Sequence, residues 1–183
     1  MKFTHKLIVL LIVLSTSTTF AQKLRVSLEG GIAKPVGWQG RYTIQGEGGE
    51  VALEYFFNDK WSLGFDFGLR EFLYEPIYFE QPALRLKTYE AICGYHIQLS
   101  SHVNVYGKLG AGIYQTSSTY RSDDEAFYHF AELNAGLSPK VGFNYRLMPS
   151  LFLDMNASYS FTTDRELGFF GVVVGFQYDF LEF

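Results

Sequence analysis

Residues 131–147 read AELNAGLSPKVGFNYRL, and they alternate between two kinds of side chain without a break. One parity carries bulky apolar groups such as Leu133 and Phe143. The other parity carries all of the charges, including Lys140 and Arg146. A period of two is the signature of a β-strand. Soluble strands usually have about 5–6 residues, whereas a tilted strand that crosses a bilayer needs about 9–11. The stretch therefore predicts a strand of a membrane-spanning β-barrel.

Seven further segments alternate in the same way. The eight expected strands are residues 23–33, 49–57, 60–70, 87–99, 103–116, 131–147, 151–162 and 169–180. The third shows the pattern clearly, since Trp61, Leu63 and Phe65 are separated by small or polar residues. Backbone groups in lipid must all be paired, and among sheets only a closed barrel pairs them. Bacterial single-chain barrels have an even number of strands. We therefore predict an all-β fold, an eight-stranded antiparallel up-and-down transmembrane β-barrel.

The N-terminus predicts export. Lys2 and Lys6 form a short basic region, an apolar run covers residues 7–14, and Thr19-Phe20-Ala21 resembles a cleavage site. The apolar run is too short to span a bilayer as a helix. We expect residues 1–21 to be a cleavable signal peptide and residues 22–183 to form one barrel domain. Aromatic residues make up 18% of the chain, which suits a barrel in a membrane.

The links between the expected strands alternate in length. Three are short, Asn58-Asp59, Ser100-Ser101-His102 and Met148-Pro149-Ser150, and are built from turn-forming residues. Four are longer, about 34–48, 71–86, 117–129 and 163–168. Outer-membrane barrels have short periplasmic turns and longer outer loops. This predicts periplasmic termini and long loops outside the cell. A soluble lipocalin-like barrel is the alternative fold, but it would carry its apolar face inside.

The polar parity predicts a charged interior. The expected inward acids are Glu29, Glu50, Glu54, Asp66, Glu90, Glu132 and Asp154, and the expected inward bases are Arg25, Arg70, Lys87, Lys108, Lys140 and Arg146. A barrel of eight strands is just wide enough for side chains to fill. We therefore expect a network of buried ion pairs, with a proton- or ion-conducting path as the alternative. Pro139 cannot donate a ladder hydrogen bond, so a bulge or a shifted sheet edge is expected there.

Aromatic residues are expected to form two girdles at the headgroup levels. Those near the periplasmic ends are Phe57, Trp61, Tyr145, Tyr178 and Phe180, and those near the outer ends or loops are Tyr42, Phe72, Tyr74, Tyr120, Phe127, Tyr128, Phe161 and Phe169.

Taken together, the chain resembles the small eight-stranded outer-membrane barrels of OmpA/OmpX type, particularly the porin-family outer-membrane β-barrel domain of Bacteroidota. The resemblance covers the whole chain after residue 21 and is sharpest at residues 175–180, GFQYDF. This end is similar to the C-terminal strand that the outer-membrane insertion machinery reads, which implies that machinery as a partner. Leu181-Glu182-Phe183 follows, so either Phe180 or Phe183 is the terminal aromatic of the signal.

No residue pattern indicates catalysis. Some small barrels of this membrane deacylate lipid A with an H-x-S pair, but His96, His102 and His129 are followed two residues later by Gln98, Asn104 and Ala131. No GxSxG sequence occurs. We expect His96 to be a core histidine near Tyr106. We expect no catalytic residue, no metal site and no cofactor. Cys93, the single cysteine, is interpreted as a small apolar residue on the lipid-facing parity.

The outer loops carry the expected specificity. Aromatic residues in the loops at 71–86 and 117–129 form candidate recognition surfaces. The acidic triplet Asp123-Asp124-Glu125 could hold a cation that bridges lipopolysaccharide phosphates, or it is a solvated run of charge. A net charge of −4 gives no reason to expect nucleic acid as a partner. We predict a structural, surface-interaction or accessory-subunit role at the bilayer, with a small-solute channel as the alternative and a lipid A-modifying enzyme as a weaker one.

Overall fold

A computed structural model describes residues 23–37, 44–73, 83–121, 127–163 and 168–182. The expected signal peptide, residues 1–21, lies outside these ranges, and so do the acidic triplet, Phe183 and the middle of the loop at 71–86.

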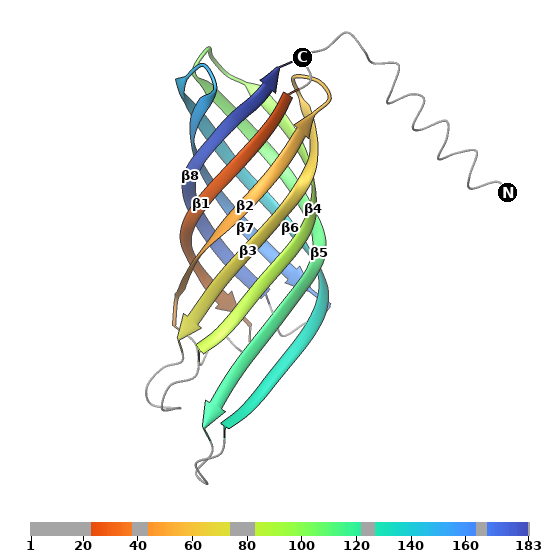
Figure 1. The fold of residues 1–183 in the computed structure, drawn as a ribbon, viewed down its shortest axis with the longest axis vertical. Coiled ribbons are helices and arrows are strands. Elements are labelled where there is room, and N and C mark those ends of the chain that lie inside the picture. Colours follow the sequence, from red (N-terminus) through yellow and green to blue (C-terminus); the bar gives the residue numbers. More distant parts are fainter. Residues whose placement is uncertain (1–22, 38–43, 74–82, 122–126, 164–167, 183) are drawn as a thin grey trace, which may run out of the picture.

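Eight antiparallel strands close into a barrel in the order β1 to β8, which confirms the predicted fold (Figure 1). The strands are β1 Lys23–Val36, β2 Gly46–Phe56, β3 Trp61–Leu73, β4 Ala83–Gln98, β5 Val103–Arg121, β6 Phe127–Met148, β7 Leu151–Thr162 and β8 Gly168–Glu182. Each pairs with its neighbours in sequence, and β1 pairs with β8 to close the sheet. The short links gather at one end, here called the short-turn end, and the longer links lie at the other, the long-loop end. In the part of the chain that is described, no helix is long and apolar enough to cross a membrane.

The alternation of side chains separates an apolar wall from a polar interior. On the outside, Phe65 is 72% exposed and Leu28 is 66% exposed. On the inside, Glu54 and Asp154 are fully buried. This arrangement is the reverse of a soluble lipocalin-like barrel, whose apolar groups would fill the interior. The outward assignment of Cys93 is also confirmed, because its side chain is exposed.

Three charged residues depart from their expected place in the interior. Lys87 shares the parity of Tyr89 and pairs with Leu69, so it lies on the outer wall. Glu132 has the inward parity but is exposed, because β7 pairs with β6 only from Gly136 onward and does not extend alongside Glu132. Arg146 is exposed at the short-turn end, where its guanidinium lies over the Phe152 ring. The parity of Glu132 and Arg146 was therefore right, but both stand too close to a strand end to be enclosed.

Pro139 does not produce the expected bulge. The β6–β7 pairs stop at Leu137↔Phe161 and resume at Lys140↔Ser158 in the same register, while β5 pairs continuously across Leu109↔Pro139. Because Pro139 has no N–H, the pairing of β6 with β7 is interrupted next to it, but the register of the two strands does not change. Register shifts occur instead between Arg146 and Met148, and between Leu24 and Arg25. At the second shift, Arg25 pairs with Asp179 and Leu24 with Leu181, which leaves Phe180 as the extra residue of the bulge.

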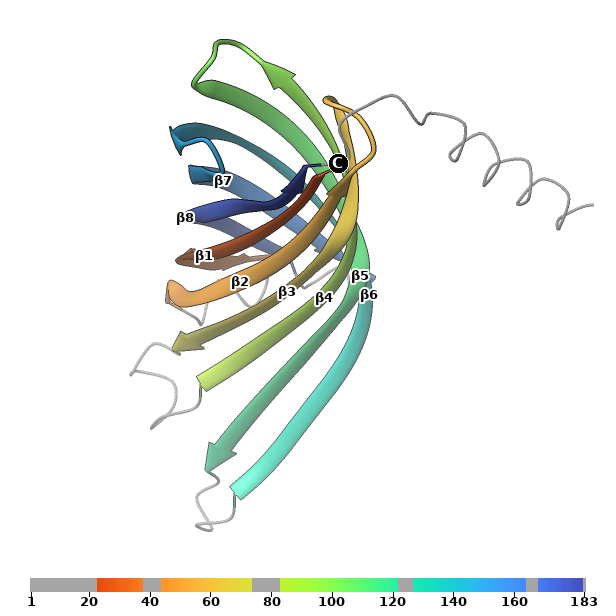
Figure 2. The ribbon, with the colours of Figure 1, turned by 45° about the horizontal axis from the view of Figure 1, so that its top comes forward.

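Two strands extend well past the rest of the barrel. β5 and β6 pair with each other as far as Arg121↔Phe127. On one side, β4 pairs with β5 only as far as Ser118. On the other side, β7 pairs with β6 only as far as Gly136. Residues 119–121 of β5 and 127–129 of β6 therefore pair only with each other, and they form a two-stranded ribbon that projects from the long-loop end, as Figures 1 and 2 show. Below the ribbon, residues 130–135 of β6 pair with β5 but have no partner strand among the described residues on the β7 side.

Candidate functional site: a closed interior and a projecting ribbon

An apolar layer closes the interior near the long-loop end. It consists of the buried residues Ala33, Phe72, Leu84, Leu86, Tyr114 and Phe169. The rings of Phe72 and Phe169 stack with their centroids 5.5 Å apart. Both had been predicted to lie in the outer aromatic girdle, and this prediction is wrong because each follows the inward parity of its strand. Strand parity alone contained the signal, since Phe72 is in phase with Arg70 and Phe169 is out of phase with Phe170.

The layer below is ionic. The Lys140 ammonium binds the Asp66 carboxylate and lies 3.4 Å from carboxylate oxygens of Glu50 and Glu90. Arg70 donates to Glu50 over 2.8 Å. The Tyr114 hydroxyl donates to Glu90 and so joins the apolar layer to the ionic one. The predicted network of buried ion pairs is present at this level.

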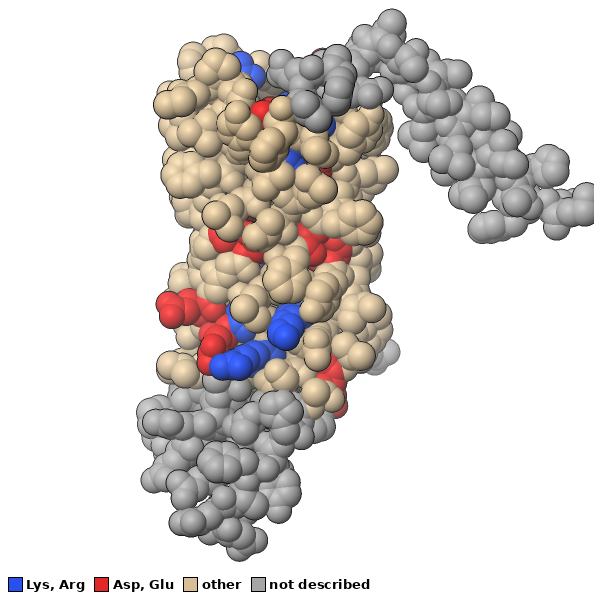
Figure 3. All heavy atoms as spheres, in the orientation of Figure 1, with Lys and Arg blue, Asp and Glu red and all other residues tan. Residues whose placement is uncertain are grey.

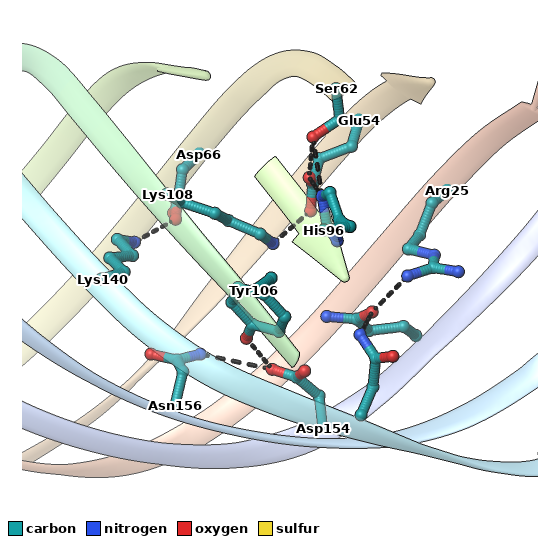
Figure 4. A network of polar contacts seen from close by, with 12 residues as sticks. Arg25, Glu54, Ser62, Asp66, His96, Tyr106, Lys108, Lys140, Asp154 and Asn156 are labelled. Atoms are coloured by element: carbon teal, nitrogen blue, oxygen red, sulfur yellow. Dashed lines mark hydrogen bonds and ion pairs between the residues drawn. The ribbon is translucent and has the colours of Figure 1, made fainter. Parts of the chain in front are cut away.

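Glu54 forms a second cluster of polar contacts (Figure 4). Its carboxylate accepts a hydrogen bond from Lys108 and another from the Ser62 hydroxyl, over 2.9 Å. The Ser62 Oγ also lies 3.0 Å from His96 Nε2. His96 is buried, and its ring lies 5.5 Å from that of Tyr106. This confirms the prediction of a hydrogen-bonded core histidine.

Among the described residues, Glu29 and Asp154 are held by neutral hydrogen-bond donors and not by ion pairs. The Asn156 amide donates to Glu29 over 2.7 Å and to Asp154 over 3.3 Å, and the Tyr106 hydroxyl donates to Asp154 over 2.7 Å. Among the described residues, no Lys, Arg or His nitrogen forms an ion pair with either carboxylate. No group of three or more potential metal ligands is found in the described ranges.

A cation between two rings closes the short-turn end. The Arg25 guanidinium lies 4.8 Å from the Phe56 ring centroid and 4.5 Å from that of Phe152. It also binds both carboxylate oxygens of Asp179, over 2.6 and 3.0 Å. Arg25 is only 1% exposed, so solvent hardly reaches its side chain from this end of the barrel. With the apolar layer at the other end, the ionic interior is enclosed from both sides.

The outer wall becomes charged towards the long-loop end (Figure 3). Arg85 and Glu71 point outward and form an ion pair of 3.6 Å, and Lys87 lies on the same wall. Charged groups are disfavoured in hydrocarbon but suit the headgroup level. These residues therefore mark where the apolar band of the wall ends.

Just below the ribbon, side chains of β6 are exposed. Leu133 is 71% exposed, and Ala131, Glu132 and Ala135 are exposed beside it. The side chains of residues 118–130, including His129 and the aromatic residues predicted for recognition, lie outside what the structure describes. No catalytic grouping joins the other two histidines of the barrel, since His96 is buried whereas His102 is exposed and stacks on Tyr145.

An eight-stranded closed sheet with an apolar wall and an ionic interior defines a transmembrane β-barrel protein. The chain belongs to the family described as the outer membrane protein β-barrel domain, which matches residues 7–180. This confirms the resemblance inferred from the sequence and places the protein in the bacterial outer membrane. A search of curated protein sequences gave no match.

Solved structures with the same fold come from several bacteria. The attachment invasion locus protein Ail of Yersinia pestis is 16% identical, with 88% of this chain and 99% of Ail covered at a TM-score of 0.59. Neisserial surface protein A is 18% identical, with 86% and 97% covered at 0.59. OprG of Pseudomonas aeruginosa is 14% identical, with 88% and 96% covered at 0.55. At these identities the likeness establishes the fold.

Proposed function

We propose that this protein is a non-enzymatic surface-interaction barrel, in which the closed barrel anchors the β5–β6 ribbon and the ribbon contacts a partner outside the cell. The observation that carries this proposal is the stacked pair Phe72 and Phe169, within an apolar layer that closes the interior. A channel for small solutes needs a continuous polar path. Here a solute would have to pass the apolar layer, the ion pairs and the Arg25 contact with Phe56 and Phe152.

The lengths of the links support one orientation in the membrane. We infer that the short turns and both termini face the periplasm and that the ribbon stands outside, as in other outer-membrane barrels. Arg85 and Lys87 then lie where they can contact lipopolysaccharide phosphates. The insertion machinery would read the last strand, β8, where Phe180 is the residue of the bulge. Ail has been crystallised with the heparin analogue sucrose octasulfate, which supports ligand binding by a barrel of this fold.

A ribbon-shortened variant tests the proposal. Ser118 and Phe130 are opposite one another, so residues 119–129 can be replaced by Asn-Gly, a two-residue hairpin turn, without changing the register below. The intact chain and this variant would be immobilised in lipid nanodiscs and exposed to solubilised outer membranes and culture medium. We expect a set of proteins that the intact chain retains and the variant loses, as quantified by mass spectrometry.

A bilayer recording completes the test. The purified barrel should give no conductance steps in planar bilayers. Conductance in the intact protein, or identical retained proteins with and without the ribbon, would contradict the proposed function. The accessory-subunit role remains within the same proposal, because the retained protein can be another outer-membrane protein.

A further inference from the structure

The interior of the barrel contains more buried acids than buried bases. Among the described residues, the buried acids are Glu29, Glu50, Glu54, Asp66, Glu90, Asp154 and Asp179, and the buried bases are Arg25, Arg70, Lys108 and Lys140. Even with the buried His96 charged, the acids would outnumber the bases. A buried carboxylate without a positive partner is strongly destabilising. The excess of acids therefore has to be offset by protons or by bound cations.

The excess is concentrated at two residues. The ion pairs of the other acids are Asp179 with Arg25, Glu54 with Lys108, and Glu50, Asp66 and Glu90 with Lys140. Glu29 and Asp154 have no ion pair with any described residue. Glu29 is 6% exposed and Asp154 is fully buried, so bulk water does not replace the missing partner.

The register of three strands brings Glu29 and Asp154 together. Glu29 of β1 and Asp154 of β7 both pair with Gly175 of β8, one from each side. Gly175 has no side chain, and a Cβ atom there would lie only 2.8 Å from Glu29 Cγ. The glycine therefore leaves space for the Glu29 side chain on the inner face of β8. The two carboxyl groups are within hydrogen-bonding reach of one another.

Glu29 also lies opposite a third acid. It pairs with Glu50 of β2, and these two carboxyl groups are within hydrogen-bonding reach as well. Glu50 accepts a hydrogen bond of 2.8 Å from Arg70, which keeps it ionised. Like charges that lie opposite one another on adjacent strands are destabilising. An ionised carboxylate can only accept hydrogen bonds, so two carboxyl groups bond to each other only when one of them holds a proton.

The bases that face Glu29 are engaged elsewhere. They are Lys108 of β5 and Lys140 of β6. Lys108 binds the Glu54 carboxylate and Lys140 binds that of Asp66. Neither ammonium forms an ion pair with Glu29, and β8 contributes only Gly175 at this level.

The pair also lacks hydrogen-bond donors. The Asn156 amide donates to both carboxyl groups, and the Tyr106 hydroxyl donates to Asp154 (Figure 4). Asp154 Oδ1 and Asn156 Oδ1 are nevertheless buried without a hydrogen-bond partner among the described residues. A proton on one of the two carboxyl groups removes one negative charge and adds one donor. A metal ion suits the place less well, because the described ranges contain no group of three His, Cys, Asp or Glu side chains that could hold one.

We propose that Glu29 and Asp154 form a proton-binding site inside the barrel, in which the two carboxyl groups share one proton and carry a single negative charge. The site lies between the apolar layer and the Arg25 contact with Phe56, so it is enclosed at both ends. It is separate from the ribbon and does not depend on what the ribbon binds.

Infrared spectroscopy of the barrel in lipid vesicles at pH 7 detects the proton. A protonated carboxyl group has a carbonyl stretch that is separate from the bands of carboxylates and amides. We expect such a band in the intact protein and its loss in Glu29→Gln and in Asp154→Asn. Glu54→Gln is the matched control and should keep the band, because Glu54 is equally buried but is bonded to Lys108. Spectra of both site variants that match the intact protein in this region would overturn the shared proton.

Urea unfolding as a function of pH gives a second readout. The carboxyl groups of the unfolded chain release their protons at about pH 4, whereas the folded barrel keeps this one. Unfolding near neutral pH therefore releases a proton, and the free energy of unfolding falls as pH rises. The equilibrium constant for unfolding should rise about tenfold more per pH unit in the intact protein than in Glu29→Gln, since one proton is at stake. Equal slopes would contradict the site.

Calcium and EDTA distinguish the proton from a metal ion. The intact protein should unfold at the same urea concentration with either addition. A midpoint that calcium raises and EDTA lowers in the intact protein, but not in Glu29→Gln, would assign the site to a metal ion and overturn the shared proton.

Discussion

Phe72 of β3 and Phe169 of β8 come from strands that β1 and β2 separate in the closed sheet, yet their rings stack inside the barrel with an interplanar angle of 26°. Each residue lies at the end of its strand that is next to the long loops. The stack forms the centre of the apolar layer, with Tyr114 linking it to the ionic interior through Glu90. This contact closes the interior of the barrel at the long-loop end.

Truncating the rings of this layer should destabilise the barrel. Phe169→Ala removes one ring of the stack and should destabilise the fold by about 3–5 kcal/mol, the usual cost of truncating a buried Phe. Phe72→Ala with Phe169→Ala should lower the free energy of unfolding further, as measured by urea unfolding in lipid vesicles. It should add no conductance steps in planar bilayers, because the Arg25 contact with Phe56 and Phe152 still closes the short-turn end. Phe170→Ala is the matched control, because Phe170 is the next residue but points to lipid and is 46% exposed. A larger effect at Phe170 than at Phe169 would contradict the closure.

Removing one partner of the buried Lys108–Glu54 pair should be costly. Lys108→Met leaves the Glu54 carboxylate fully buried without its base, which should lower the free energy of unfolding by about 3–5 kcal/mol. Glu54→Gln combined with Lys108→Met should recover much of this loss, since no uncompensated charge then remains. Urea unfolding in lipid vesicles measures the cycle. Additive losses in the double variant would show that the two side chains do not interact.

Close strand packing should make Gly112 irreplaceable. A Cβ atom at Gly112 would lie 1.9 Å from the Tyr89 carbonyl oxygen, so Gly112→Ala must push two strands apart. We expect a loss of about 1–3 kcal/mol or more, as for other overpacked sites. Gly107→Ala in the same strand meets nothing within 4 Å and should be neutral or slightly stabilising. The yield of the heat-modifiable folded band on SDS gels compares the two variants, and equal yields would argue against the register of β4 and β5.

The free-energy cost of placing a charge on the lipid-facing wall should depend on how deep in the bilayer the residue lies. Leu109, opposite Cys93 and Pro139 near the middle of the wall, is 51% exposed. Leu109→Arg should cost about 2–4 kcal/mol, the value for a cation at the bilayer midplane, whereas Leu99→Arg near the short turns should cost about 0–1. Refolding into vesicles of matched thickness measures both changes. A costlier substitution at Leu99 would place the membrane elsewhere on the barrel.

The proposed orientation can be tested on whole cells. A protease site inserted between Ser122 and Asp123 should be cut on intact cells, because the ribbon is expected outside. A site inserted between Ser100 and Ser101 should be cut only after the outer membrane is permeabilised. The reverse pattern would invert the barrel.

Alternation along the chain was enough to predict eight strands and their two faces. Trp61, Leu63 and Phe65 face outward as expected, and β7 has the predicted bounds. The other strands run further, most of all at the long-loop end of β4, β5 and β6, where the sequence no longer alternates cleanly. Parity is a local property of consecutive residues, which is why it can be read without knowing the neighbours. The buried places of Phe72 and Phe169 were available from the same signal.

Partners and closure depended on the tertiary structure. Lys108 and Glu54 are 54 positions apart, and only the closed sheet brings them together. The effect of Pro139 depended on which neighbouring strand its nitrogen faces, and the exposure of Glu132 depended on where β7 stops pairing. Each of these is set by the register between strands. Register arises from the combined packing of all eight strands, so a single strand's sequence fixes its faces but not its neighbours' alignment.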